Sequence, residues 1–107
     1  MNRLKKSDID SIFKSGKFRK FGAISMHFKK NNLGYPRFGF ALSKKNFKKA
    51  TERNLVKRRA REIIRMHAAG SASGHDVLLV FGSEIKNLTF SALKEQLIDA
   101  LKSARIL

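Results

Sequence analysis

The sequence DVLLVF, residues 76–81, contains the longest uninterrupted apolar run of the chain, residues 77–81. A strand that is buried on both faces carries such a run, whereas a half-buried strand alternates between apolar and polar residues. The run is far too short to cross a bilayer, because a spanning helix needs about 20 apolar residues. The stretch therefore predicts a strand at the centre of a sheet, covered on both of its faces.

Two other segments alternate in the manner of half-buried strands. AISMHF, residues 23–28, and RFGFALS, residues 37–43, each place large apolar side chains on one face and mostly small side chains, with one histidine, on the other. The segment KKNNLGYP between them is rich in turn-forming residues. We expect the two strands to form an antiparallel hairpin whose large face joins the core. The small face is too thin for a second core and could form the floor of a groove.

The remaining segments with regular spacing are helical. Ile9, Ile12 and Phe13 share one face of a short helix that Gly16 ends. The expected elements, in chain order, are a helix at 7–15, strands at 23–28 and 37–43, a helix from after 45 to about 69, a loop at 70–75, the strand at 76–81 and a helix after 88; a further short strand around 17–22 stays open. This order predicts an α+β fold, a small two-layer α/β sandwich with a mixed sheet. The length argues for one domain over residues 1–107.

The charge is large and unevenly distributed. The chain has 24 Lys and Arg against 8 Asp and Glu, a net charge of +16. Residues 44–65 hold ten basic and two acidic residues, whereas residues 66–107 hold four of each. Such a balance points to a polyanionic partner, which could be RNA, DNA or an anionic membrane surface. The first two-thirds of the chain are therefore expected to bind, and the last third to serve as scaffold.

The sequence also bears on the compartment. It has no cysteine, so it has neither a disulfide framework nor a cysteine zinc site. Its first ten residues, MNRLKKSDID, include basic residues but no apolar segment of the kind that follows in a secretory signal. We expect a cytoplasmic protein without a membrane partner.

The stretch ERNLVKRRAREIIR, residues 52–65, separates into two faces when it is placed on a helical wheel. The predicted core-facing stripe consists of Val56, Ala60, Ile63, Ile64 and His67. The opposite face consists of Asn54, Lys57, Arg58, Arg61 and Arg65. Like charges one turn apart destabilise an isolated helix by a few tenths of a kcal/mol per pair. A bound anion would offset this repulsion, and phosphate suits the planar fork of arginine best.

Two plainer interpretations of this helix stand beside phosphate binding. The basic face could simply be solvated. A helix lying on a membrane surface is disfavoured, because the apolar stripe has neither Trp nor Phe. Asn54 adds a neutral donor and acceptor to the basic face, and it could address a base edge or a sugar.

The residues also carry a family resemblance. RNLVKRRARE, residues 53–62, resembles the Arg-Asn-x-x-Lys-Arg-x-x-Arg-Glu signature of the bacterial ribonuclease P protein subunit. RLKKSDIDSIFKSG resembles the first helix of that family, PRFGFALSKKNFKKATERN its strand with the lead into the signature helix, and GHDVLLVF the strand that follows. The resemblance covers nearly the whole chain in the same order.

The resemblance implies a fold and a function. The family fold is a small α/β sandwich with a left-handed βαβ crossover, which patterning alone does not predict because right-handed crossovers are the rule. In the family, a catalytic RNA with Mg²⁺ removes the 5′ leader of precursor tRNA. The protein aids binding of substrate and metal but supplies no catalytic group. The implied partners are ribonuclease P RNA and precursor tRNA, with no obligate protein partner and no cofactor that the protein holds tightly; no residue is assigned to a metal site.

The resemblance also assigns site residues by position. The implied surface for the RNA subunit consists of Arg53, Asn54, Lys57, Arg58, Arg61 and Arg65, extended by Lys44, Lys45, Lys48 and Lys49. The implied cleft for the single-stranded leader consists of Ile9, Phe13, His27 and Ala41, with Phe18 and Phe21 at its edge. An aromatic residue is common in the family where this chain has Ile9 and where it has His27. A weaker hold on the leader is therefore an expectation, since stacking on an aromatic ring contributes about 1–3 kcal/mol per base.

Two rival functions differ in class. An enzyme acting alone is disfavoured, because the three histidines lie on different predicted elements and no HExxH, GxSxG or P-loop pattern is present. A ribosomal or nucleoid-type basic module shares the size and the charge. Such a module needs a basic face but no cleft for a single strand, so the groove over the small face distinguishes the two.

Overall fold

The chain folds into three α-helices and a four-stranded sheet, as the computed structural model describes for residues 4–68, 71 and 73–107. The elements are α1 (Lys6–Ser15), β1 (Lys17–Phe21), β2 (Ile24–Lys30), β3 (Arg37–Ala41), α2 (Ala50–Ala68), β4 (His75–Phe81), a 3-10 turn η1 (Ser83–Asn87) and α3 (Phe90–Ser103). This order confirms the prediction, including the additional strand β1. The predicted end of the second helix at 69 and part of the predicted loop at 70–75 lie outside the described residues. No helix in the described part of the chain is long and apolar enough to cross a membrane.

The strand order of the sheet is β1-β2-β4-β3. β4 pairs with β2 in antiparallel fashion and with β3 in parallel fashion, so it lies at the centre, as its apolar run predicts. The predicted hairpin between the segments at 23–28 and 37–43 is wrong, because β4 lies between them and β2 instead forms its hairpin with β1. The turn residues at 29–36 indicate a change of direction only. The strand that lies beside β2 on its other edge is β4, which comes much later in the chain.

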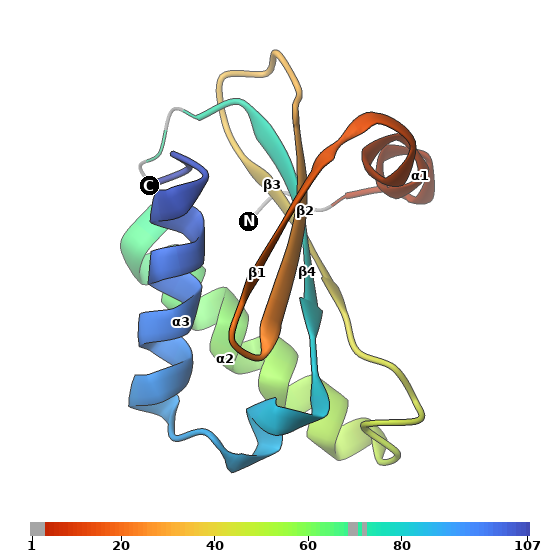
Figure 1. Cartoon of the computed structure of the whole chain (residues 1–107), viewed down its shortest axis with the longest axis vertical. Coiled ribbons are helices and arrows are strands. Elements are labelled where there is room, and N and C mark those ends of the chain that lie inside the picture. The colour runs from red at the N-terminus through yellow and green to blue at the C-terminus, as the bar shows by residue number, and fades with distance from the viewer. Residues whose placement is uncertain (1–3, 69–70, 72) are drawn as a thin grey trace.

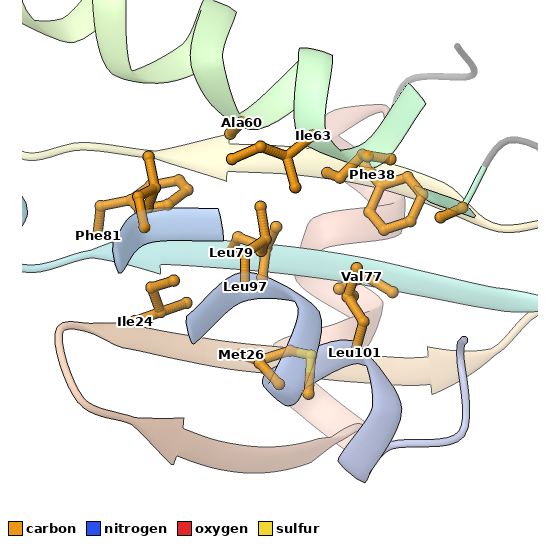
Figure 2. Packing of buried hydrophobic residues seen from close by; sticks show 14 of the residues in the cluster. Ile24, Met26, Phe38, Ala60, Ile63, Val77, Leu79, Phe81, Leu97 and Leu101 are labelled. Atoms are coloured by element: carbon orange, nitrogen blue, oxygen red, sulfur yellow. The ribbon is translucent and has the colours of Figure 1, made fainter. Parts of the chain in front are cut away.

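The sheet has a helical layer on one face and a single helix on the other. In Figure 1, α3 lies to the left of the sheet, α2 rises from the lower right to the left, and α1 lies near the upper end of the sheet on the right. The large apolar faces of β2 and β3 join the core, as predicted: Ile24, Met26, Phe28 and Phe38 are buried. Figure 2 shows side chains from the sheet, α2 and α3 meeting in this core. Burial of this face fixes the register of the strands and leaves the small face toward α1.

The connection from β3 through α2 to β4 joins neighbouring parallel strands. In Figure 1 both strands run downward, α2 rises from the lower right to the left of the sheet, and the sheet order places β3 behind β4. The path is therefore left-handed, as the family resemblance implies. About 98% of such connections are right-handed, so no general rule predicts this arrangement from the sequence.

Candidate nucleic-acid interface

The helix α2 presents a basic face to solvent. Asn54, Arg58 and Arg65 are exposed, and Lys57 and Arg61 are half-buried. The opposite stripe packs in the core through Val56, Ala60, Ile63, Ile64 and Ala68. The guanidinium of Arg61 lies over the ring of Phe40, with 5.8 Å between its central carbon and the ring centroid. This contact restricts the Arg61 side chain.

His67 does not belong to the core stripe, contrary to the prediction from the wheel. It is exposed, and Ala68 is buried in its place. The buried cluster that includes Ala68 also includes Ala104 and Ile106, which follow α3 at the C-terminal end. The packing partner changes along α2, so a wheel drawn from its middle turns does not describe its last turn.

Arg53 points away from the basic face toward the loop before α2. Its Nη1 donates hydrogen bonds to the carbonyl oxygens of Phe47 at 2.6 Å and Lys48 at 3.3 Å. The Phe47 side chain is fully buried, so Arg53 braces the loop where the chain enters the core. This role separates Arg53 from the outward residues of the helix. The helix α2 begins at Ala50, whereas the sequence predicted a start soon after residue 45.

The loop that Arg53 braces carries the remaining predicted basic residues. Residues 42–49 connect β3 to α2, and their lysines are all exposed: Lys44, Lys45, Lys48 and Lys49. The backbone N–H of Asn46 donates to Ser43 Oγ at 3.1 Å, and that of Phe47 donates to the Ser43 carbonyl oxygen at 2.9 Å. The loop therefore has a defined shape. It extends the basic face of α2 beyond the start of the helix.

A cluster of three rings lies where α1 meets the small face of the sheet. The ring of His27 on β2 lies 4.7 Å from that of Phe13 on α1 and 4.8 Å from that of Phe18 on β1, measured between centroids. Phe13 is 58% exposed and Phe18 is 56% exposed, so neither is a core residue. Partial burial lowers the pKa of His27. The burial therefore favours the neutral imidazole, and the cluster is a mainly uncharged aromatic surface.

The other predicted cleft residues take different positions. Phe21 lies on the opposite face of the sheet, where it pairs with Ile24 and packs against the core. Its placement in the cleft is thus wrong, because Phe18 and Phe21 are three residues apart and side chains in a strand alternate. Ala41 is half-buried and shares the small face with His27. Ile9 lines a separate hollow of about 360 Å³ with Gly39 and Arg61, at the edge formed by β3.

An ion-pair network fastens α1 to the sheet. Arg37 on β3 donates from Nε to Asp76 Oδ1 at 2.8 Å and from Nη2 to Asp76 Oδ2 at 2.7 Å. Its Nη2 also donates to Asp8 Oδ1 on α1, at 3.1 Å. The hydrogen bond from the backbone N–H of Lys5, with the nearby Arg37 guanidinium, lowers the pKa of Asp8. This network sets how far α1 stands above the sheet.

Sequence reasoning missed this network, although a signal was present. Asp76 opens a strand that is otherwise apolar, and its residue is only 7% exposed. A buried carboxylate needs a charged or hydrogen-bonding partner. Arg37 stands at the start of the parallel neighbour and pairs with Asp76 in the sheet register. Without the order of the strands, the partner could not be chosen.

A family model described as Ribonuclease P matches residues 1–105. The chain belongs to the ribonuclease P protein family. It is 36% identical to the ribonuclease P protein component of Fusobacterium nucleatum over 113 residues, which covers all of both chains. It is also 36% identical to that of Thermotoga petrophila over 99 residues, 89% of this chain and 84% of that one.

Solved structures of the family agree with the fold. The RNase P protein from Thermotoga maritima has a TM-score of 0.86 at 33% identity, over 96% of this chain and 97% of that one. The RNase P protein of Staphylococcus aureus has a TM-score of 0.88 at 25% identity, over 99% of this chain and 97% of that one. Membership in the ribonuclease P protein family implies a part in tRNA 5′ processing, within an endoribonuclease complex that includes a ribonuclease P RNA.

Proposed function

We propose that the chain binds the catalytic RNA of ribonuclease P through α2 and the loop at 42–49, and that it holds the single-stranded 5′ leader of precursor tRNA on its aromatic cluster. The observation that carries this proposal is the separation of two surfaces. One is basic and lies along α2, and the other consists of Phe13, His27 and Phe18. A folded RNA needs phosphate contacts, whereas a single strand offers bases that stack.

The basic surface suits the backbone of a folded RNA. Arg58 and Arg65 are exposed two helical turns apart, and Arg61 is held between them by the ring of Phe40. Their guanidinium groups can bind phosphate oxygens in pairs. Asn54 adds a donor and an acceptor at the start of this face. The slope of log K against log salt measures how many phosphates the face neutralises. On the value for B-DNA, each phosphate contributes about 0.9 to this slope.

The aromatic cluster suits an unpaired strand. Its two phenyl rings are more than half exposed and flank a mainly neutral imidazole, so bases can stack without a charge having to be desolvated. Stacking contributes about 1–3 kcal/mol per base and accepts any base. The cluster lies on the small face of the sheet beside α1, whereas α2 packs in the core on the other face. One protein molecule can therefore hold the RNA subunit and the leader at the same time.

The chemical step is assigned to the RNA with Mg²⁺, which the family resemblance implies. Among the residues that the structure describes, no three His, Asp or Glu side chains gather where they could hold a metal ion. We place the Mg²⁺ mainly on RNA phosphates, as the family resemblance implies. The chain's own part is to neutralise phosphate charge and to position the leader, and both effects lower the Mg²⁺ concentration that cleavage requires.

The test is reconstitution. Purified protein, its cognate ribonuclease P RNA and a precursor tRNA are mixed at low Mg²⁺, and release of the 5′ leader is followed over time. The protein should stimulate cleavage, and absence of stimulation would refute the proposed function. A ribosomal or nucleoid-type module would bind the RNA without this stimulation.

The surface on α2 is tested by salt dependence. Arg58→Ala and Arg61→Ala should each weaken binding to the RNA subunit and lower the slope of log K against log salt by about 1. Lys102→Ala is the matched control, because it removes one exposed positive charge from α3. An unchanged slope in both arginine variants would show that another face binds the RNA.

A further inference from the structure

A groove of about 670 Å³ lies along α2, apart from the aromatic cluster. One wall comes from the connection between β2 and β3 and from the start of β3, with Tyr35 and Phe38. The other wall is α2, with Arg58, Glu62 and Arg65. Sites that take a small molecule or a single nucleotide have volumes of roughly 300–1,000 Å³ and mostly apolar walls. The groove thus has room for one base with its sugar.

Tyr35 offers an aromatic ring at a fixed place on the rim. It is 41% exposed, and the next residue, Pro36, is buried. The Asn31 side-chain amide donates to the Tyr35 carbonyl oxygen at 3.1 Å and to Asp76 Oδ1 at 2.9 Å. The backbone at Tyr35 is therefore tied to the central strand through Asn31. With the backbone held in this way, stacking of a base on Tyr35 has only the side chain left to order, which limits the loss of conformational entropy.

Glu62 is the unusual member of the groove. It lies one turn from Arg58 and one turn from Arg65, yet the salt bridges found within the described part of the chain do not include it. A carboxylate among arginines would repel a phosphate placed directly over it. It would accept hydrogen bonds from the edge of a base that presents donors, and guanine presents two adjacent donors, N1–H and N2–H.

We propose that this groove binds one unstacked guanine of the RNA that α2 contacts, with the base on Tyr35, its donor edge on Glu62, and the adjoining phosphates on Arg58 and Arg65. The inference rests on the proposed binding of the RNA subunit and specifies one contact within it. The three guanidinium groups of the lining favour a nucleotide over an apolar peptide, because a peptide would leave them without an anion.

The first experiment compares variants of Tyr35 in binding to the RNA subunit. Tyr35→Ala should weaken binding by roughly 5- to 150-fold, the range that corresponds to loss of one stacked base. The salt slope should stay unchanged, because no phosphate contact is removed. Tyr35→Phe should restore most of the affinity, since it keeps the ring. Phe90→Ala is the matched control, because Phe90 is a comparably exposed ring, at 39%, on α3.

The second experiment uses the fact that the chain has one tyrosine. Protein made with 3-fluorotyrosine gives one fluorine resonance, which reports on Tyr35 alone. The probes are trinucleotides with guanosine, inosine or adenosine at the centre. The resonance should shift most with guanosine, less with inosine, which lacks the N2 amino group, and least with adenosine. Glu62→Gln should abolish the preference for guanosine over inosine while the resonance still shifts.

The outcomes separate this inference from the function on which it rests. Stimulation of cleavage together with full affinity of Tyr35→Ala for the RNA subunit would overturn the groove and leave the proposed function standing. Failure of the wild-type protein to bind the RNA subunit would overturn both. A fluorine shift of equal size with all three trinucleotides would overturn the guanine preference. A shift caused by an apolar peptide and by none of the trinucleotides would identify the groove as a protein-docking site, which also contradicts the inference.

Discussion

Replacing Arg37 by Met should destabilise the fold and loosen α1. The change keeps an unbranched side chain of similar length and removes the guanidinium that joins α1, β3 and β4. Asp76 would keep only the hydrogen bond from the Asn31 amide, at 2.9 Å, and Asp8 would lose its contact with the sheet. A buried carboxylate would then remain without its counter-ion.

The size of the effect follows from burial. Removing one partner of a buried ion pair costs about 3–5 kcal/mol. The side chains of Arg37 and Asp76 are 20% and 10% exposed, so water can reach part of the pair after the change. We therefore expect a loss near the lower end, about 3 kcal/mol in the free energy of unfolding. For a domain of this size, that corresponds to a fall in melting temperature of roughly 10–20 °C.

Urea unfolding followed by circular dichroism measures this loss, and calorimetry gives the melting temperature. Arg19→Met is the matched control: Arg19 is exposed on β1 and makes none of the salt bridges found among the described residues, so the change should cost less than about 0.5 kcal/mol. A loss in Arg37→Met of less than about 1 kcal/mol would refute the reasoning. Such a result would mean that water stabilises the carboxylates of Asp8 and Asp76 as well as the guanidinium of Arg37 does.

Three further predictions concern other parts of the molecule. Phe47→Ala should cost about 3–5 kcal/mol in the free energy of unfolding, because the ring is fully buried; equal stability of this variant and of the surface control Phe90→Ala would contradict that role. His27→Ala should weaken binding of precursor tRNA, in complex with the RNA subunit, more than binding of mature tRNA, and equal weakening of both would remove His27 from the leader site. The lowered pKa of Asp8 means that its stabilising effect is complete above its ordinary pKa of 3.8 and is lost as the pH falls through the lower folded-state value. The difference in unfolding free energy between wild type and Asp8→Asn should therefore shrink in denaturation experiments below about pH 4. A difference that stays constant with pH would argue against this role of Asp8.

Local patterns in the sequence predict most of the elements but not how the strands are ordered. The apolar run at 77–81 predicts a central strand because it is a property of that segment alone. The pairing of β2 with β4 depends on residues about fifty positions apart, and the turn signals at 29–36 carry no information about it. The left-handed crossover is likewise a property of the whole arrangement, and only the family resemblance implied it.

Local patterns also predict only part of the candidate interface. The basic face of α2 follows from the helical period, and the proximity of Phe13 to His27 was anticipated from the family pattern. The family resemblance assigned Arg53 to the RNA surface, whereas in the structure its side chain turns back and donates to carbonyl groups of the loop before α2. Such a turn depends on the shape of the loop, which the residues of the helix do not predict. Phe21 was misplaced because β1 was recognised only as an open possibility, without its register.

The central position of β4 has a consequence for synthesis of the chain. When the protein emerges from the ribosome, the β1–β2 hairpin can form early, but β3 has no neighbour in the sheet until residues 75–81 have followed. One edge of β2 and one edge of β3 stay unpaired until α2 and then β4 have been synthesised. Such long-range pairing is slow, and the unpaired edges are prone to aggregation. A nascent chain halted at residue 74 would thus present a hairpin beside an unpaired strand, which is a substrate for chaperones rather than a smaller version of the fold.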